Sequence, residues 1–370
     1  MKEDVEYINL DDSNYNELHS LINKFKCNYI YLITEKTNLD ITVNTKTVIK
    51  EIKLEATNLN ELKIPYNLEN LYIYNADNLN CIIGKSKNCN LSFCNNINFD
   101  KDFFTFVEIL HINSYKGKVD ISNMSSLTEL SLSFCDDLSG LNKNNTVTKL
   151  IIEFMDIENI NFVSNFPMLK DIIINNCSKL SCINVLKTFN LNSIEIQHCD
   201  KLKDIDFYNI RNIKKISIRY CPCLKDVSMF TEVEELDLSG CVNIKNLSSL
   251  ERNGKLRYLN LSYTNIRHVF SFRNVYKLVL RGCKKIKCVK GLDNVKLLDL
   301  YDCTGIEDFS GLSNNIYLNL VNTNFIKNDE NFKYIQNIEN IELSKETYML
   351  PNHVLLKSES IIYSKNFLPK

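Results

Sequence analysis

Fourteen cysteines and five histidines are the side chains of this 370-residue sequence that could support nucleophilic or metal chemistry. A thiol can act as a nucleophile, bind zinc or form a disulfide, and histidine is a common partner in the first two roles. Such a site needs each of its residues once, whereas a packing position is needed as often as a structural unit recurs. The spacing of the cysteines therefore decides between chemistry and packing.

Eight of the cysteines end the same local pattern, L-x-L-x-x-C or a close variant of it, as in LDLSGC at 236–241. A variant with Thr or Met in place of Cys fills most of the gaps, so that the units tile the chain at intervals of 18 to 23 residues. Aligned on the pattern, the position of the cysteine forms a column, which contains Thr57, Ala76, Cys94, Tyr115, Cys135, Met155, Cys177, Cys199, Cys221, Cys241, Thr264, Cys283, Cys303, Thr323 and Glu346.

The column accepts Ala, Thr and Met as well as Cys, which favours packing, because a buried thiol behaves as a small hydrophobe with a weak donor. Stacked Cβ atoms on neighbouring parallel strands would lie about 4.8 Å apart, farther than the usual Cβ separation of a disulfide. The pairs Cys177/Cys182 and Cys283/Cys288 follow from the repeat itself, and no second metal-binding pair accompanies them. We therefore expect reduced, structural thiols, and neither a metal nor a cofactor.

Catalytic motifs are absent from the sequence. It contains neither H-E-x-x-H nor G-x-S-x-G, and the segment GKS at 84–86 lacks the upstream glycine of a phosphate-binding loop. His198 and Cys199 are adjacent, but adjacent side chains on a strand point to opposite faces and make a poor nucleophile–base pair. We expect that the protein is not an enzyme.

A period of this length is typical of solenoids, and the pattern resembles the leucine-rich repeat family, with Cys or Thr where most such repeats hold Asn. The resemblance implies a mostly β solenoid of the α/β class, a shallow horseshoe with one long parallel sheet on its concave face. The return segments on the convex side are about a dozen residues long, so we expect extended or 3₁₀ structure there. Each unit buries too little apolar surface to fold alone, which explains the many copies.

The repeat boundaries predict three regions. Residues 1–47 form an N-terminal cap, with a short amphipathic helix over about 12–26 that Asp12 or Ser13 caps, and a strand over about 28–34. About fifteen repeats occupy 48–350, and 351–370 form a C-terminal cap or tail.

The strand positions that do not face the core form the concave sheet, which in this family is the usual binding surface. There Ile151 and Ile173 are neighbours, aromatic residues follow the strands at the sheet margin, and charged residues occupy several later strands. Exposed aromatics are typical anchors of protein interfaces, although these rings could instead cover turn backbone, and the charges could be a solvated face. The candidate protein-binding residues are Phe134, Ile151, Phe154, Ile173, Glu195, Arg219, Tyr220, Asp237, Tyr263, Arg281, Asp299 and Tyr301.

The composition limits the classes of partner and the compartment that we expect for this protein. A net charge of −1 lacks the basic excess that nucleic-acid binding requires. The N-terminal segment is acidic, and no run of apolar residues is long enough for a signal peptide or a membrane span, so we expect a cytoplasmic monomer without membrane contact. The bias toward Asn, Ile and Lys resembles coding in an A+T-rich genome, such as that of a large DNA virus or a protist, and a viral protein would act in the host cytoplasm.

Two functions fit these observations. The first is a non-enzymatic scaffold that binds a protein partner, of unknown identity, through the concave sheet and its aromatic margin. The second is a regulatory or targeting subunit of an enzyme complex, resembling phosphatase regulators or the substrate receptors of ubiquitin ligases. The sequence has no leucine-proline opening of the kind that begins an F-box, which weakens the ligase alternative.

Overall fold

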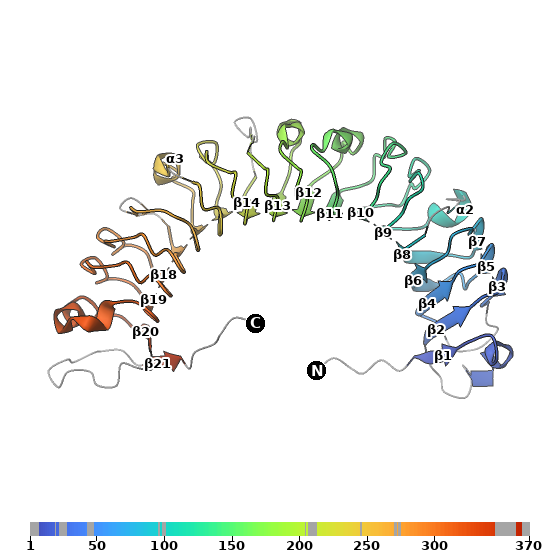
Figure 1. Ribbon diagram of the computed structural model, residues 1–370, viewed down its shortest axis with the longest axis horizontal. Coiled ribbons are helices and arrows are strands. Elements are labelled where there is room, and N and C mark those ends of the chain that lie inside the picture. The colour runs from blue at the N-terminus through green and yellow to red at the C-terminus, as the bar shows by residue number, and fades with distance from the viewer. Residues whose placement is uncertain are drawn as a thin grey trace. The chain divides into compact units, whose positions relative to one another are not determined.

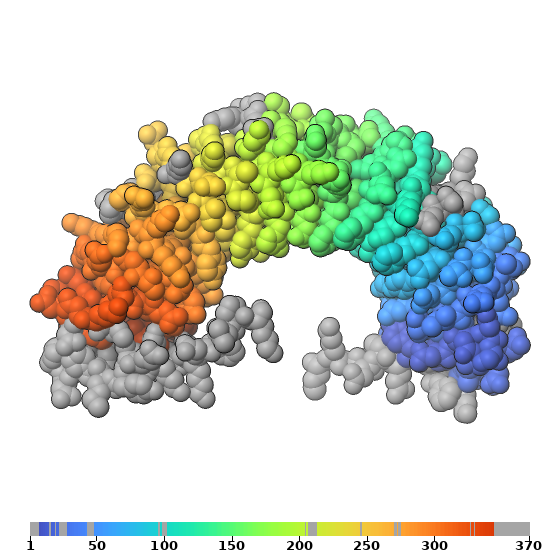
Figure 2. Space-filling model, viewed as in Figure 1, coloured from blue at the N-terminus to red at the C-terminus, as the bar shows by residue number. Residues whose placement is uncertain are grey.

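The computed structural model describes residues 7–18, 20–21, 28–42, 48–94, 97, 101–203, 205, 213–244, 246–269, 272, 275–344 and 360–364. The chain divides into two compact units, Met1–Cys177 and Ser178–Lys370. Within each unit the strands lie side by side on one face, and short helices and loops return the chain on the other (Figure 1). In the space-filling view the coloured atoms of successive turns touch throughout each unit (Figure 2).

The first unit contains a main sheet whose neighbouring strands are all parallel. Its strands, in order of pairing, are β1 (Ile8–Leu10), β2 (Tyr29–Thr34), β4 (Glu51–Ala56), β6 (Leu68–Tyr74), β8 (Ser86–Ser92), β9 (Ile109–Asn113), β10 (Glu129–Ser133), β11 (Lys149–Glu153) and β12 (Asp171–Asn175). A second parallel sheet, which the sequence did not predict, lies in the return segments and consists of β3 (Asn38–Asp40), β5 (Glu61–Lys63) and β7 (Cys81–Ile83). The remaining elements are η1 (Tyr15–Glu17), α2 (Lys101–Phe104) and η2 (Asn161–Asn165).

The second unit repeats the same parallel pairing in chain order. Its strands are β13 (Ser193–Gln197), β14 (Lys215–Arg219), β15 (Glu235–Asp237), β16 (Tyr258–Asn260), β17 (Lys277–Val279), β18 (Leu297–Asp299), β19 (Tyr317–Asn319), β20 (Asn340–Ser344) and β21 (Ser360–Ser364). The return segments hold single turns, which are η3 (Asn184–Thr188), α3 (Ser248–Glu251), η4 (Phe325–Lys327) and η5 (Asp329–Tyr334).

The alternation of the strands explains why the chain stacks in register. In β11, Leu150 and Ile152 are buried, while the residues on either side of them are partly exposed. Leu150 pairs with Leu130 of the preceding strand and Ile172 of the next, so like side chains lie over one another and close a continuous core. The structure confirms the expected fold class, a mostly β leucine-rich-repeat solenoid with extended or single-turn returns.

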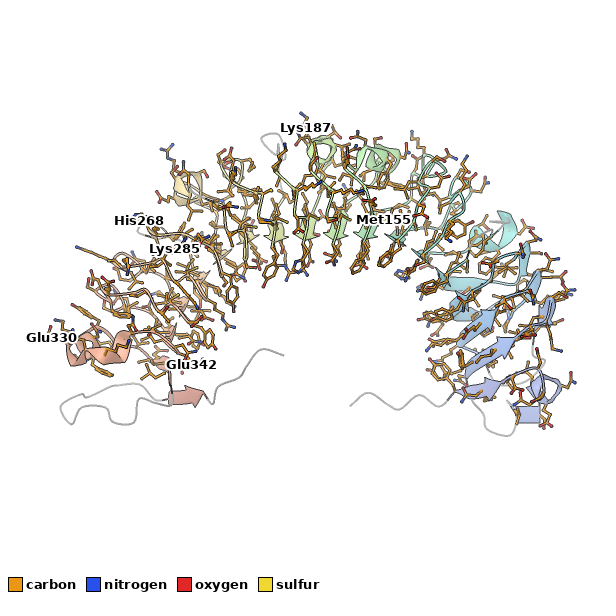
Figure 3. All side chains as sticks on the ribbon, in the orientation of Figure 1. Met155, Lys187, His268, Lys285, Glu330 and Glu342 are labelled. Atoms are coloured by element: carbon orange, nitrogen blue, oxygen red, sulfur yellow. The ribbon has the colours of Figure 1, made fainter. Side chains whose placement is uncertain are left out.

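The cysteine column lies in the interior. All eight of its cysteines are buried, and the described cysteines are thiols. Their sulfurs donate to backbone carbonyls, as Cys283 does to Leu261 O at 3.0 Å and Cys303 to Leu280 O at 2.9 Å. Figure 3 marks Met155, a buried member of the same column, inside the first unit. The thiols thus satisfy strand carbonyls of their own or the preceding turn while they pack.

The assignment of Thr57 to this column is wrong, because Thr57 is exposed and the neighbouring Ala56 is buried. β4 continues straight through Ala56, whereas in later turns the chain bends before the column residue. Ala56 pairs with the buried Thr34 of β2, so the first turns bury the residue one place earlier. Glu346, also assigned to the column, lies outside the described residues.

The N-terminal helix differs from expectation in its start. Residues 15–17 form a 3₁₀ turn, residues 18, 20 and 21 are helical, and residues 22–27 lie outside the described part. Asp12 does not cap this segment, because its carboxylate accepts hydrogen bonds from Thr34 Oγ1 and from Glu35 N at 3.0 Å. Asp11 Oδ1 accepts from Ser13 N at 2.8 Å and Asn14 N at 3.2 Å, in the turn that precedes this segment, and the Ser13 hydroxyl donates to the same oxygen.

Candidate binding surfaces on the sheet face

A residue one or three positions after the end of each main-sheet strand from β6 to β19 adopts a left-handed backbone, and this bend directs the next residue of the chain into the core. Five of these residues are aromatic, with φ values of 56°, 51°, 52°, 52° and 57° for Phe93, Phe134, Phe154, Tyr220 and Tyr263. The other turns hold Asn75, Ser114, Asn176, His198, Gly240, Gly282, Asp302 and Asn322 there, and of these glycine, asparagine and aspartate tolerate the conformation most readily. The aromatic members are therefore unusual occupants of a position that the fold itself requires.

In the first unit two of these rings stack on each other. Phe134 and Phe154 have centroids 4.8 Å apart and planes 5° from parallel, and they remain 50% and 46% exposed. The ring spacing equals the spacing of parallel strands, because each ring is carried by the end of a neighbouring strand. We call the pair Phe134 and Phe154 the aromatic ridge of the first unit.

The second unit carries Tyr220 and Tyr263 in the same position, 39% and 46% exposed. The ring of Tyr220 lies over Gly240 of the next turn and stacks on His198 of the preceding turn, with centroids 4.8 Å apart. Tyr263 lies over Gly282 in the same way. These rings do cover turn backbone, as the alternative reading expected, but more than a third of each side chain still faces solvent.

Two more predicted residues stand on the sheet face of the first unit. Ile151 of β11 and Ile173 of β12 are paired in register and partly exposed. Phe154 follows β11 directly after Glu153. The strand ends of β10 and β11 and these two isoleucines thus present apolar surface on one part of the sheet face.

The charged residues predicted in the second unit are largely paired with one another. Arg219 forms an ion pair with Glu195, and Arg281 Nε lies 2.6 Å from Asp299 Oδ2 while its guanidinium carbon is 5.9 Å from the centre of the Tyr301 ring. Asp237 accepts hydrogen bonds from Ser239 N at 2.9 Å and Asn260 Nδ2 at 3.0 Å. Asp299 itself is buried, so only Arg281 of that pair reaches solvent. The Arg219–Glu195 pair is partly exposed on both sides and contributes little net stability.

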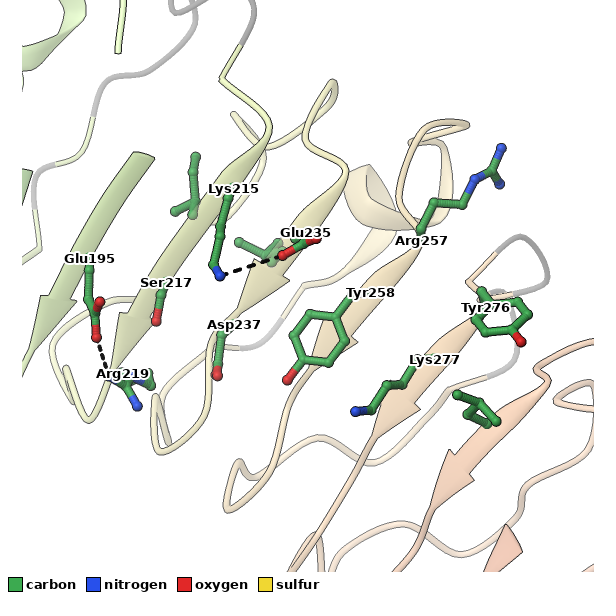
Figure 4. A pocket seen from close by; sticks show the side chains of 13 residues that line it. Glu195, Lys215, Ser217, Arg219, Glu235, Asp237, Arg257, Tyr258, Tyr276 and Lys277 are labelled. Carbon is green, nitrogen blue, oxygen red and sulfur yellow. Dashed lines mark hydrogen bonds and ion pairs between the residues drawn. The ribbon is translucent and has the colours of Figure 1, made fainter. Parts of the chain in front are cut away.

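Three of these residues, Glu195, Arg219 and Asp237, line a hollow of about 570 Å³ on the sheet face of the second unit (Figure 4). Most other residues that line the hollow were not predicted from the sequence, and they include Lys215, Glu235, Tyr258, Tyr276 and Lys277. Lys215 pairs with Glu235 at 3.7 Å, and Lys277 Nζ lies 5.5 Å from the centre of the Tyr258 ring. In the described part of the chain no carboxylate pairs with Lys277. Lys215, Glu235, Tyr258 and Lys277 stand one position before the first core residue of their strands, a column that the same alignment would have supplied, and Tyr276 stands one position earlier still.

A second feature that the sequence analysis did not predict is a group of tyrosines in the first unit, one immediately before β1 and the others on β2 and β6. We call Tyr7, Tyr29, Tyr31, Tyr72 and Tyr74, all partly exposed, the tyrosine patch. β4 runs between β2 and β6 and presents Glu51, Lys53 and Glu55 among these rings. Tyr29 and Tyr31 precede the region in which repeats were expected, so the alignment did not place them beside Tyr72 and Tyr74.

The electrostatics of the tyrosine patch show that it is partly desolvated. Burial, followed by the hydrogen bond to Glu55, raises the pKa of Tyr31 above its ordinary value. Burial and then the charge of Glu51 raise the pKa of Tyr72. The pKa of Lys53 is raised chiefly by its hydrogen bond to the Tyr7 hydroxyl at 2.6 Å. All of these groups keep their ordinary protonation state at neutral pH.

The residues considered for catalysis do not come together. Cys199 is buried, and the ring of the adjacent His198 lies outside on Tyr220. Burial lowers the pKa of His111, which lies on β9 in the first unit. No cluster of three or more metal-binding side chains occurs among the described residues. In the same part of the chain, no helix is both long and apolar enough to cross a membrane.

No protein-family model and no curated protein matches this sequence. Among solved structures, the chain is similar to an internalin, InlF, from Listeria monocytogenes, with 16% identity over 71% of this chain and 82% of that chain and a TM-score of 0.46. It is also similar to TLR13 in a complex with ssRNA13, with 13% identity over 92% of this chain and 68% of that chain and a TM-score of 0.48. Neither likeness is close enough to bear on function.

Proposed function

We propose that this chain, a leucine-rich-repeat protein by its fold, is a non-enzymatic scaffold that binds a protein partner through its sheet face. The aromatic ridge of the first unit and the half-exposed Tyr220 and Tyr263 of the second are its main anchors. The partner contacts are completed by Ile151 and Ile173 in the first unit, and by Glu195, Arg219, Asp237, Arg281, Asp299 and Tyr301 in the second.

The observation that carries this proposal is the combination of strain and exposure at Phe134 and Phe154. A left-handed backbone at a residue other than glycine costs on the order of 1–3 kcal/mol. Their rings are about half exposed, so burial recovers only part of that cost. Asn or Gly occupies the same position in other turns and fulfils the structural role at lower cost. A strained, exposed aromatic residue is therefore better explained by contact with a partner than by the stability of the fold.

The physical character of the surface supports a protein as the ligand. Aromatic rings with limited side-chain freedom lose little entropy on binding and are common anchors in protein interfaces. The ion pairs that surround the rings in the second unit resemble the polar rim of such an interface. With a net charge of −1, the chain has no basic excess that would favour nucleic acid.

The test is a comparison of three purified proteins as bait: the wild-type chain, the Phe134→Asn/Phe154→Asn double variant, and Tyr66→Asn. Tyr66 is 65% exposed but lies in a turn outside the ridge, so it controls for the general loss of an exposed ring. We expect the wild type and Tyr66→Asn to retain a partner that the double variant loses. The partner is then identified, purified and titrated against the same three proteins.

Equal affinity of all three proteins for the purified partner would contradict the proposed role of the ridge. Capture of a phosphatase or a ubiquitin-ligase component by the wild type would identify the scaffold as a subunit of an enzyme complex.

A further inference from the structure

We propose that the tyrosine patch binds an arginine or lysine side chain presented by an extended segment of a partner protein, at Glu55 between Tyr31 and Tyr74. The inference rests on the proposed scaffold function only in taking the ligand to be a polypeptide. It concerns strands β2, β4 and β6 and none of the ridge residues.

The register of the three strands brings these groups together. β4 pairs with β2 on one side and with β6 on the other, so that Tyr31, Lys53 and Tyr72 lie in one row across the sheet. The next exposed row contains Glu55 between the half-exposed Ile33 of β2 and Tyr74 of β6, and Tyr31 reaches along the face to donate its hydroxyl to Glu55 Oε2 at 3.2 Å. A carboxylate on the central strand is thus accompanied by a tyrosine from each neighbouring strand.

The patch already holds one cation of its own. Lys53 Nζ lies 4.3 Å from the centre of the Tyr7 ring and 5.6 Å from that of Tyr72, and 3.5 Å from Glu51 Oε1. An aromatic ring attracts a cation more strongly when the cation is partly desolvated, and the nearby carboxylate adds a favourable charge interaction. This arrangement shows the kind of group that the patch accommodates.

Glu55 offers the same combination without a cation. Its carboxylate accepts hydrogen bonds from Tyr31 and from Asn75 Nδ2 at 3.0 Å, both neutral donors. Among the described residues no lysine or arginine pairs with Glu55, and the three charged groups of β4 sum to −1, from two carboxylates and one ammonium. Charge complementarity therefore favours a basic group at this position.

Arginine fits the position better than lysine. A guanidinium group is planar, stacks on aromatic rings and donates two parallel hydrogen bonds to one carboxylate, whereas an ammonium group acts as a point charge. The ligand lies on an open sheet face, which an extended segment can follow along the strands. We therefore expect recognition of a basic segment rather than of a folded apolar surface.

The probe is a blocked ten-residue glycine-serine peptide with three arginines, titrated against the full chain by calorimetry at physiological salt. Its neutral control contains citrulline in place of each arginine. We expect binding of the arginine peptide and none of the citrulline peptide. Ring signals of ¹³C-labelled tyrosine should shift on addition of the arginine peptide, and the Tyr31→Phe and Tyr74→Phe variants assign them.

The variants separate this site from general charge attraction. Glu55→Gln and Tyr31→Leu should each weaken peptide binding by about fivefold, whereas Tyr31→Phe, which keeps the ring, should retain it. The matched control is Glu153→Gln, because Glu153 stands in the same column of β11, accepts from Asn175 Nδ2 at 2.8 Å, and has no tyrosine beside it in the register. We expect no effect of that change.

Equal weakening by Glu55→Gln and Glu153→Gln would overturn the proposal, since the peptide would then respond only to net charge. Binding of the citrulline peptide, or failure of the arginine peptide to bind, would overturn it as well. None of these outcomes affects the ridge, which is tested with different variants and a different ligand.

Discussion

The ring of Tyr220 lies so close to Gly240 of the next turn that a β-carbon at residue 240 would overlap the ring atom Cδ1. Gly240 also has a φ of +73°, which glycine adopts without cost. Tyr263 and Gly282 repeat the same relationship. In the first unit the residue beside Phe134 is Phe154, and there the two rings stack instead. The following turn thus holds a glycine beside Tyr220 and Tyr263 and a second ring beside Phe134, whereas Phe93 and Phe154 are followed at this position by Ser114 and Asn176.

Gly240→Ala should destabilise the chain by about 1–3 kcal/mol, because the substitution adds both backbone strain and the overlap with Tyr220. The double variant Tyr220→Ser/Gly240→Ala should recover the part that is due to overlap. Urea unfolding of the wild type, both single variants and the double variant measures this coupling. Strictly additive effects would mean that the ring moves away at no cost.

Phe134→Asn/Phe154→Asn should change the free energy of unfolding by less than about 1 kcal/mol. Relief of strain at two left-handed residues is offset by the loss of the stacked pair, worth about 0.5–1.5 kcal/mol, together with the loss of the burial of two half-buried rings, worth about 1 kcal/mol each. The comparison is Leu150→Ala in the core between them, which should cost about 2–5 kcal/mol. A loss for the double variant as large as that for Leu150→Ala would assign the ridge to the core.

Stability should fall at alkaline pH through the buried thiols. Burial raises the pKa of Cys241 to about 12 and that of Cys94 to about 11, from an ordinary value of 9.0. Folding therefore keeps these thiols protonated. Below about pH 9 the thiols of the unfolded chain are protonated as well, and the free energy of unfolding is unaffected by their titration. As the pH rises from about 9 toward the folded-state pKa values, the unfolded chain loses these protons first, and the free energy of unfolding falls.

At pH 10 each such thiol should account for about 1 kcal/mol of the loss. The measurement is the urea midpoint at pH 8 and pH 10 for the wild type and for Cys241→Ala. The variant should show the smaller fall, whereas an identical fall would show that residue 241 is solvated in the folded state.

Alkylation should distinguish the buried thiol of Cys221 from the exposed thiol of Cys223. Cys221 is buried in the column, while Cys223, two residues later, is exposed. Native protein treated with iodoacetamide should be modified at Cys223 and protected at Cys221 and Cys241 until denaturant is added. Mass spectrometry of the digested protein reads out each site, and equal modification of Cys221 and Cys223 would contradict a dry column.

The tyrosine patch shows what the repeat pattern could not supply. Alignment places residues in columns only where the pattern holds, and β1 and β2 lie before the region in which it was recognised, although they pair in register with β4. Thr57 was misplaced for a related reason, since the pattern does not show which turns bend before the column residue. Most lining residues of the hollow in the second unit were not predicted, because the prediction of exposed positions covered the two columns that follow the first core residue of each strand and not the column that precedes it.

The amino-acid sequence by itself determined the parallel stacked architecture, the interior position of the cysteines and the aromatic character of the strand ends. It did so because a repeated pattern forces equivalent residues into equivalent environments. Only the tertiary structure decided the left-handed conformation of Phe134 and Phe154, the contact of Tyr220 with Gly240, and the meeting of tyrosines from β2 and β6 around Glu55. These features depend on which turns are neighbours and on where side chains point between them, and a single repeat contains neither kind of information.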